Sequence, residues 1–187
     1  MIEFDVIFKT PFFEVEASKS PFNEKGSYYR ISSLPSVIIC MVSESNEIIL
    51  INQYRPNLNC NTLEFPAGYI EKDESPIVAA RREVLEETGM ECNLLYLGKS
   101  RLLMNRYYNH EYLFVGLVKT EEKKTFNKDL LSVGKEDFID LVNQEKFEQL
   151  AALGLLNLLN MKYDIDFFKT KSFYKDIKER IYESKKN

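Results

Sequence analysis

The chain has 187 residues, of which 44% are hydrophobic, and its 25 basic and 29 acidic side chains give a formal net charge of -4. This length and hydrophobic content suit one domain with a sizeable core, and we expect no second full domain. The acidic balance provides no basic field for a polynucleotide, so nucleic-acid binding is not expected. The cysteines, at wide and irregular spacings, match neither a disulfide framework nor a zinc site.

The N-terminus does not have the pattern of a secretion signal. Acidic residues stand at positions 3 and 5, and no cationic start leads into an apolar run. No uninterrupted apolar stretch approaches the about 18 residues of a membrane span. We therefore expect a soluble, cytoplasmic protein with no membrane partner.

Residues 1–33 are expected to form a small antiparallel meander. Segments 2–8, 12–18 and 28–33 have strand composition and are separated by turn-forming residues. Their aromatic content exceeds what exposed strands tolerate, so we expect packing on the main body, or on a second subunit with the meander as a dimerisation element. The aromatic residues are Phe4, Phe8, Phe12, Phe13, Phe22, Tyr28 and Tyr29.

The pattern of residues 34–164 predicts the main domain. Apolar runs at 36–43 and 47–55 predict a central hairpin, and Pro66 disfavours a helix in the extended segment that follows. Beyond an acidic helix that ends before Gly89, strands are predicted at 91–103 and 111–120. A polar loop is predicted at 120–135 and a final strand at 136–142.

Two helices are predicted at the C-terminal end. Residues 145–162 have a helical pattern, with Gly154 on the apolar face, where it would permit close approach of a neighbour. Residues 165–187 form a separate tail, in which Phe173, Ile177 and Ile181 predict an amphipathic helix. Mixed strands and helices favour an α/β or α+β sandwich over a parallel doubly wound sheet.

The stretch with most chemical information is GYIEKDESPIVAARREVLEETGM, residues 68–90. At about 100° per residue, Glu83 and Glu87 lie one helical turn apart with Glu86 beside them. Carboxylates so close repel each other unless a cation neutralises them, and hard oxygen ligands suit Mg²⁺ or Mn²⁺. Arg82, four residues before Glu86, is placed to orient these acids.

The spacing of this stretch resembles the Nudix box, G-x5-E-x7-R-E-U-x-E-E-x-G-U with U aliphatic. Every specified position matches, from Gly68 and Glu74 through Arg82 to Gly89 and Met90. The runs QYRP at 53–56 and EFPAG at 64–68 resemble the ADP-ribose or nucleotide-sugar pyrophosphatase branch of that family.

The resemblance implies an α/β/α sandwich around a mixed sheet and a homodimer formed through the N-terminal strands. It implies metal ligation by Glu83, Glu87 and the Ala67 carbonyl, with Glu86 beside the metals. Gly68, Glu74 and Gly89 then have structural roles in the motif, and Arg55 would touch the phosphates of a nucleotide diphosphate.

The chemistry also follows from the charges. Metals on Glu83 and Glu87 could clamp a diphosphate and lower the pKa of a bound water, which is then the nucleophile. Arg55, with Arg30 and Arg106 as further candidates, would supply the cationic grip. Within the acidic helix, Glu86 and Glu87 are the candidate catalytic acids and Arg82 orients them.

Two segments depart from the family pattern. Members that cleave ADP-ribose usually carry a proline near residues 104–108, where this chain has Arg106, Tyr107 and Tyr108, and the tyrosines resemble the dinucleoside polyphosphate hydrolases. The family's loop glutamate, used as a base or as a ligand of a third metal, is best matched by Glu136, although Gly134 stands where a second acid is usual. Glu121 and Glu122 are the alternatives.

Our leading hypothesis is metal-dependent hydrolysis of the diphosphate bond in ADP-ribose or another nucleotide sugar, giving two monophosphates. Tyr107 makes a dinucleoside polyphosphate hydrolase the first alternative. A non-catalytic nucleotide-binding regulator on the same fold is the second, although it would be expected to lose box acids, and none is lost.

Overall fold

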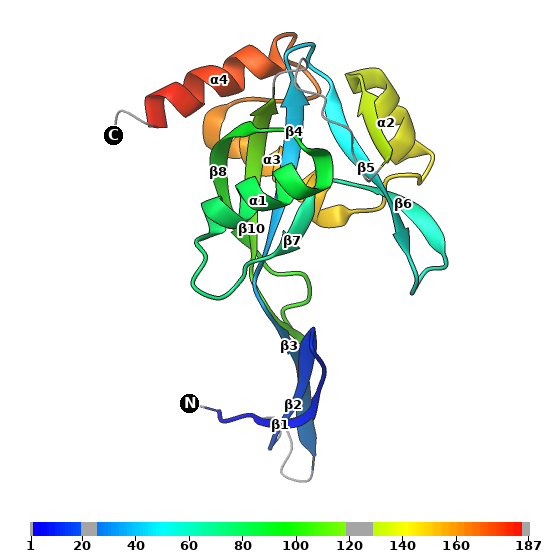
Figure 1. Ribbon diagram of the computed structural model, residues 1–187, viewed down its shortest axis with the longest axis vertical. Helices are drawn as coiled ribbons and strands as arrows, with labels where there is room; N and C mark the ends of the chain where they lie inside the picture. The colour runs from blue at the N-terminus through cyan, green and yellow to red at the C-terminus, as the bar shows by residue number, and fades with distance from the viewer. Residues whose placement is uncertain (1, 20–25, 119–128, 185–187) are drawn as a thin grey trace.

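The structure, a computed structural model, describes residues 2–19, 26–118 and 129–184, which form two sheets and the helices around them (Figure 1). The larger sheet has the order β11-β5-β4-β10-β8, with β6 added to β5 and β7 to β4. Its strands are β4 (Ser36–Ser43), β5 (Ile48–Arg55), β6 (Cys60–Glu64), β7 (Ala67–Tyr69), β8 (Cys92–Ser100), β10 (Glu111–Val118) and β11 (Asp129–Val133).

Strand β4 is central to this sheet and shows why it is mixed. It pairs in parallel with β10, from Ser36↔Glu111 to Ser43↔Val118, and antiparallel with both β5 and β7. The short antiparallel β4–β5 pairing follows a turn with Asn46 at φ 63°, so the predicted central hairpin is confirmed.

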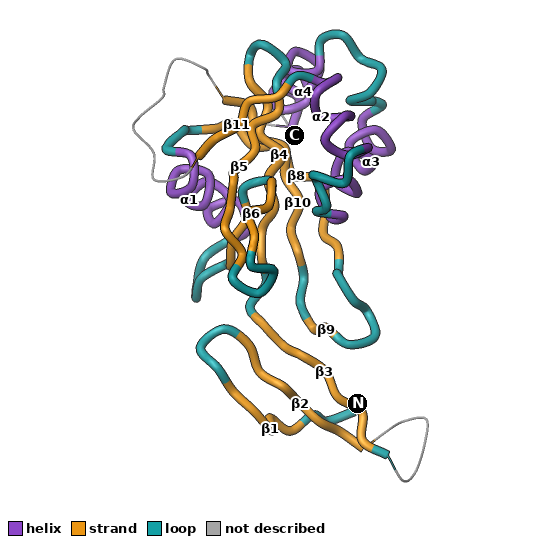
Figure 2. The backbone as a smooth tube through the Cα atoms, turned by 90° about the vertical axis from the view of Figure 1, so that its right-hand side faces the viewer, coloured by secondary structure: helices purple, strands orange, loops and turns teal. Residues whose placement is uncertain are grey.

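Both faces of β4 are covered by helices, since all its side chains from Val37 to Ser43 are buried. Val37, Ile39 and Met41 share a cluster with helix α1 (Pro76–Thr88). Ile38, Cys40 and Val42 share the other cluster with helices α2 (Lys135–Asn143), α3 (Leu150–Tyr163) and α4 (Phe173–Ser184). Figure 2 shows α1 on one side of the sheet and α2 to α4 on the other, which confirms the α/β/α sandwich.

The smaller sheet projects from the body below β4 (Figure 1). Its order is β1 (Asp5–Lys9), β2 (Phe13–Lys19), β3 (Ser27–Ser33) and β9 (Tyr107–Tyr108), where the first three strands form the predicted meander. Strand β9 comes from the main body and pairs in parallel with β3.

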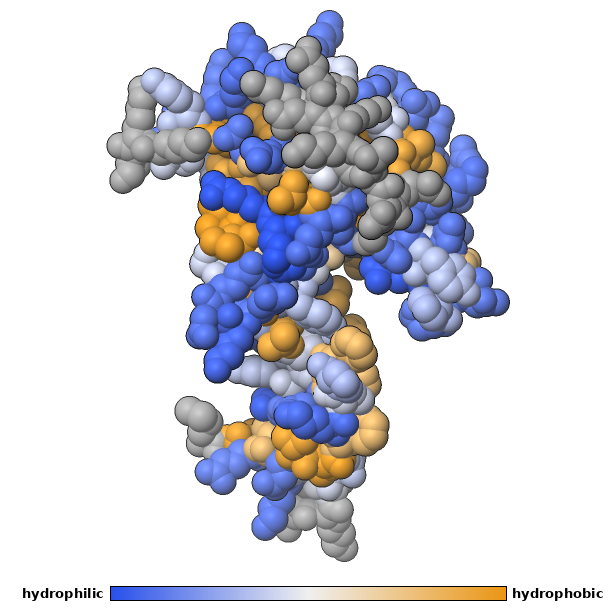
Figure 3. All heavy atoms as spheres, viewed as in Figure 1, coloured by the Kyte–Doolittle hydropathy of each residue, from blue (hydrophilic) through white to orange (hydrophobic). Residues whose placement is uncertain are grey.

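Many side chains of the meander are exposed, so the first of the two expected arrangements, packing of its aromatics on the main body, is wrong for several of them. The exposed fraction is 57% for Phe8, 68% for Phe12 and 50% for Tyr29. Hydrophobic groups lie on the surface of this projecting part in Figure 3. Phe22 lies outside the described residues. Packing on a second subunit remains a prediction.

The prediction of a final strand at 136–142 is wrong, because these residues form helix α2. Phe138, Leu141 and Val142 have the helical i, i+3, i+4 spacing, and all three pack on the cluster around α3. The strand lies earlier, at β11, within the stretch predicted as a loop, and it pairs antiparallel with β5. Helix α2 therefore follows the last strand after a single residue, Gly134.

Helix α3 begins five residues later than predicted, at Leu150, and buries a different face. Ala152, Leu155, Leu156 and Leu159 face the core, whereas Leu150 is 78% exposed. Gly154 is exposed, and a Cβ there would meet nothing within 4 Å, so no neighbour makes a close approach. Phe147 is buried, but from the segment that precedes the helix.

The predicted amphipathic helix at the C-terminal end is confirmed as α4. Phe173, Ile177 and Ile181 belong to the same buried cluster as β4 and α3. The division into residues 1–33, 34–164 and 165–187 stays a prediction, although this shared core joins the third segment to the second. Among the helices of the described ranges, none has the length and hydrophobicity needed to span a membrane; the cytoplasmic location stays a prediction.

Replacing Ile177 by alanine tests whether α4 is part of the core. Ile177 is fully buried, so the lost contacts and the cavity should lower the free energy of unfolding by about 2–4 kcal/mol. Urea denaturation measures this change. Glu179→Ala, on the exposed side of the same helix, is the control and should change it by less than about 0.5 kcal/mol. Equal effects of the two substitutions would contradict the packing of α4 on the core.

Candidate active site

Helix α1 presents its acids beside strand β7 because its ends are fixed. Ser75 is the extended N-cap residue, although its side chain makes no capping hydrogen bond, and proline opens the first turn. Gly89 closes the helix in the left-handed conformation, φ 63°, and its N–H donates to the Leu85 carbonyl. Ala79, Ala80 and Val84 bury the opposite side against the sheet.

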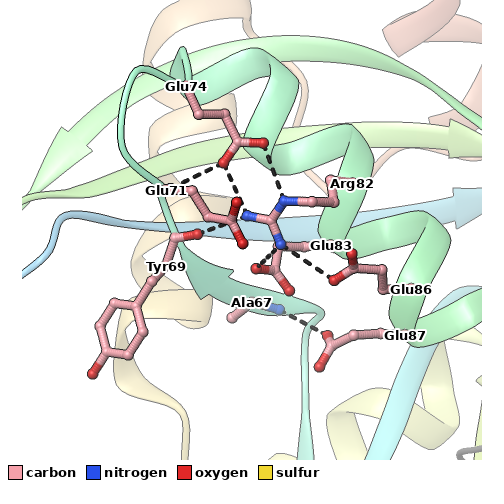
Figure 4. A network of polar contacts seen from close by, with 8 residues as sticks. All are labelled: Ala67, Tyr69, Glu71, Glu74, Arg82, Glu83, Glu86 and Glu87. Atoms are coloured by element: carbon pink, nitrogen blue, oxygen red, sulfur yellow. Dashed lines mark hydrogen bonds and ion pairs between the residues drawn. The ribbon is translucent and has the colours of Figure 1, made fainter. Parts of the chain in front are cut away.

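Arg82 connects the turn after β7 with the acids of the helix (Figure 4). Its Nε and Nη2 donate to the two Glu74 carboxylate oxygens at 3.1 and 2.9 Å, and Nη2 also donates to the Tyr69 carbonyl at 2.9 Å. Its Nη1 donates to Glu83 at 2.7 Å and to Glu86 at 3.2 Å. The bond from Arg82 holds the pKa of Glu74 below its ordinary value.

Glu83 lies directly against the backbone of Gly68. A Cβ built on Gly68 would lie 2.0 Å from both Cδ and Oε1 of Glu83, so any other residue would displace this carboxylate. Burial raises the pKa of Glu83, the bond from Arg82 opposes that rise, and the charges of Glu87 and Glu86 add to it. A carboxylate in this environment is stabilised by an added cation.

Glu87, one helical turn after Glu83, reaches the same strand, β7. Its Oε2 accepts a hydrogen bond from the Ala67 N–H at 3.1 Å. The structure thus brings Glu83 and Glu87 to the Ala67–Gly68 backbone, where the sequence predicted a metal site, while Glu86 is 59% exposed at its side chain.

These donors fit a divalent metal by chemistry, because all are the hard oxygens that Mg²⁺ and Mn²⁺ prefer. Their placement fits less completely: within the described ranges, no three His, Cys, Asp or Glu side chains are gathered closely enough to hold a metal ion. Arg82 is bound to Glu83 and Glu86 instead.

A cavity of about 340 Å³ opens beside strand β7. Its floor is the start of β4, and its walls come from β5 to β7, from the segment 102–111 and from the start of α3. The lining residues are Ser36, Val37, Ile38, Arg55, Glu64, Ala67, Gly68, Tyr69, Leu102, Tyr107, Asn109, Glu111 and Gln149.

Arg55, at the end of β5, is held at this cavity by Glu64. Its Nε donates to Glu64 Oε1 at 2.7 Å, and its Nη2 donates to the other oxygen of the same carboxylate. This bidentate bond raises the pKa of Arg55, so the guanidinium stays charged. Its side chain is 44% exposed, and Arg55 lines the same cavity as Ala67 and Gly68.

The other predicted substrate residues are divided between two places. Tyr107 lines the cavity, and its hydroxyl lies 2.8 Å from the Ser33 hydroxyl. Arg30 and Arg106 do not line the cavity among the described residues; Arg30 lies in the small sheet with Glu16, and Arg106 lies over the Tyr28 ring.

The predicted base is not brought to the acids of α1. Glu136 is exposed in the first turn of α2 and does not line the cavity in the part of the chain that is described. The alternatives, Glu121 and Glu122, lie outside the described residues.

Several lining residues were not predicted from the sequence. Glu64 lies in the EFPAG run, and its charge two residues before Pro66 was the available signal. Tyr69 and Gln149 had no signal in the sequence, because only the fold brings them together. The Gln149 side-chain oxygen accepts a hydrogen bond from the Phe65 N–H at 2.9 Å and so fixes the bend between β6 and β7. Asn109 and Glu111 are polar but buried at the start of β10.

The comparisons with known proteins agree with this geometry. The model of the NUDIX domain matches residues 33–154. A methanol dehydrogenase activator of Bacillus methanolicus is 33% identical over 57% of this chain and 56% of its own length, so the chain spans about half of that relative. An ADP-ribose pyrophosphatase of Bacillus subtilis (strain 168) is 29% identical over 75% of this chain and 80% of its own length.

Two further matches cover very different shares of this chain. An ADP-sugar pyrophosphatase of Mus musculus is 57% identical, but only over 42 residues, which are 22% of this chain and 19% of that protein. A crystal structure of an ADP compounds hydrolase superposes with a TM-score of 0.70 over 88% of this chain and 94% of its own, at 21% identity, and so supports the fold.

The family model covers well over half of the chain, includes the whole motif around Arg82 and agrees with the sandwich that carries it, so the chain belongs to the Nudix hydrolase family.

Proposed function

We propose that the protein hydrolyses the diphosphate bond of ADP-ribose or a related nucleotide sugar with Mg²⁺ or Mn²⁺, giving two monophosphates. The observation that carries this proposal is the single cavity lined by both the Arg55 guanidinium and the Ala67–Gly68 backbone, against which Glu83 and Glu87 lie. The pyrophosphatase names of the Bacillus subtilis and Mus musculus relatives support it.

The arrangement divides the work between a cation and a group of acids. Arg55 binds phosphate oxygens, and Glu64 orients its planar fork. Glu83, Glu87 and the Ala67 carbonyl would hold the metal, with Glu86 beside it, and a divalent ion there neutralises phosphate charge and lowers the pKa of a bound water. Arg82 fixes helix α1 relative to β7 and the turn after it through its bonds to the Tyr69 carbonyl and to Glu74.

Product identification with a substrate panel tests the proposal. With Mg²⁺ or Mn²⁺, the purified protein should release AMP and ribose 5-phosphate from ADP-ribose, and excess EDTA should reduce turnover to background, because the acids are then left without a metal. Restoring the metal is the control for irreversible damage by EDTA. Release of no monophosphate from any nucleotide sugar would exclude this substrate class.

The same panel decides between the two alternatives. Faster turnover of diadenosine polyphosphates than of ADP-ribose would favour the dinucleoside polyphosphate hydrolase, which the placement of Tyr107 in the cavity wall supports. Nucleotide binding without turnover would favour a regulator. One relative is named as an activator of a dehydrogenase, but the complete set of box acids in this chain favours catalysis.

Replacing Glu87 by glutamine should remove a metal ligand while nearly preserving shape. We expect kcat to fall by about a hundredfold or more, with the protein still folded, because an amide cannot neutralise the metal as a carboxylate does. Steady-state kinetics and circular dichroism measure the two effects. Glu91→Gln, an exposed acid just beyond α1, is the control and should leave kcat unchanged. Unchanged turnover in the Glu87 variant would remove Glu87 from the metal site.

Replacing Gly68 by alanine tests the contact between strand β7 and Glu83. Because the new Cβ would lie 2.0 Å from the Glu83 carboxylate, we expect the metal concentration for half-maximal activity to rise by about tenfold or more. Gly154→Ala is the matched control, because its Cβ meets nothing within 4 Å and a helical alanine stabilises by up to about 1 kcal/mol. An unchanged metal concentration for half-maximal activity in the Gly68 variant would show that Glu83 is not held by the β7 backbone.

A homodimer through the small sheet is a further part of the proposal. The exposed hydrophobic side chains of β1 and the turn after it support it, because monomers rarely expose such clusters. They are Val6, Ile7, Phe8 and Phe12. A monomer mass in sedimentation equilibrium at micromolar concentration would exclude it.

A further inference from the structure

The segment between β8 and β10 forms one wall of the cavity but is held from outside the main body. Leu102, Tyr107 and Asn109 of this segment line the cavity. Its two-residue strand β9 pairs with β3, where Ile31 is opposite Tyr107 and Ser32 is opposite Tyr108. The Ile31 N–H donates to the Arg106 carbonyl at 2.8 Å. The small sheet thus reaches the cavity through this segment.

Arg30 of β3 contacts the outer side of β9 through Tyr108. Its guanidinium carbon lies 3.8 Å from the centre of the Phe4 ring and 4.3 Å from the centre of the Tyr108 ring. Its Nε donates to Glu16 on β2, and only 25% of its side chain is exposed. A guanidinium between two rings and a carboxylate gains cation–π and charge-assisted contacts together. These contacts join β2, β3 and β9 with Phe4, the residue that precedes β1.

The inner side of β9 is connected to the same strand by Ser33. Tyr107 Oη lies 2.8 Å from Ser33 Oγ, and Asn109 Nδ2 donates to that oxygen at 3.1 Å. Ser33 Oγ is also 3.1 Å from the Leu34 carbonyl, which can only accept, so the serine proton goes there. The serine oxygen then accepts from both Tyr107 and Asn109, which gives each cavity side chain a defined orientation.

We propose that Arg30 is a positioning residue for substrate: by holding Tyr108 against β3, it keeps Tyr107 and Asn109 in the wall of the cavity. This inference rests on the proposed function, since the cavity is assigned there to the substrate. The two rings and Glu16 surround the guanidinium, which does not line the cavity in the described chain, so Arg30 acts on the substrate through β9 and not by touching phosphate.

Kinetics of Arg30 and Tyr108 variants with ADP-ribose test the proposal. Arg30→Met should raise KM by about three- to tenfold, the range expected for losing cation–π contacts at a partly buried site, and should change kcat by less than about twofold. The Mg²⁺ concentration for half-maximal activity should not change. Tyr108→Leu should have the same effect, Tyr108→Phe should restore the wild-type KM because the ring is kept, and the Arg30→Met/Tyr108→Leu double variant should add little.

Lys9→Met is the matched control in the same sheet. It removes the ion pair between Lys9 of β1 and Glu14 of β2, and Lys9 is 72% exposed and distant in the sheet order from β9. This variant should keep the wild-type KM. An equal rise in KM for Lys9→Met would mean that any weakening of the sheet has the effect, and a loss of kcat in Arg30→Met would assign Arg30 to the chemistry; either result overturns the proposal.

Hydrogen exchange tests the same inference without hydrolysis. In Arg30→Met, the Ile31 amide that bonds to Arg106 should exchange at least about tenfold faster, while amides of the β4–β10 pairing keep their protection. Lys9→Met should change neither. If the wild-type protein cleaves no nucleotide sugar, the proposed function fails, and this exchange still decides whether Arg30 holds β9. Unchanged exchange at Ile31 overturns the positioning role whatever the substrate.

Discussion

The close approach of the Glu83 carboxylate to the Gly68 backbone determines how the site is built. It requires that strand β7 carry no side chain at this position and that helix α1 lie at a fixed distance from the sheet. Arg82 maintains the second condition, since the same guanidinium bonds to the Tyr69 carbonyl of β7 and to Glu74 in the following turn, and to Glu83 and Glu86 on the helix. Charge repulsion among the acids is balanced by an arginine that the motif itself supplies.

The mixed sheet explains why this helix meets Arg55. Strand β4 is buried on both faces, with α1 on one and α2 to α4 on the other. It also pairs with β7, which leads into α1, and with β5, which ends at Arg55. Both strands deliver their functional ends to the cavity at the start of β4. Glu64 then fixes the guanidinium by a bidentate bond. The Arg55 guanidinium and the acids therefore lie at the end of a strand and on a helix, and not on loops.

The wall around Tyr107 has a different origin. It belongs to a connection between strands, and such segments are mobile unless their backbone is tied down. Here the small sheet provides the ties, through β3–β9 pairing, the Arg30 stack and the Ser33 hydroxyl. A sheet that projects from the body can thus influence the cavity without lining most of it.

Much of the fold and the motif was predictable because local patterns carried them. Uninterrupted apolar runs predicted β4 and β5, and the positions of glycines and acids predicted α1 and its end before Gly89. The misplaced last strand shows the limit: the segment 136–142 suits strand or helix by composition, and its helical form is decided by Phe138, Leu141 and Val142 packing on one cluster. Arg30 was predicted to bind substrate because an arginine on a strand has no visible partner in a sequence, and the fold supplies Phe4, Tyr108 and Glu16.

The sequence by itself therefore determined the acidic helix, its turn and the family, since every spacing needed for them lies within 23 consecutive residues, 68–90. Only the tertiary structure decided that Arg55 and Glu64 pair beside β7, that Tyr107 and Asn109 line the same cavity, and that Arg30 stacks on Tyr108 in the small sheet. The physical reason is that these contacts join strands separated by many residues. Their geometry depends on sheet order and register, which no local pattern specifies.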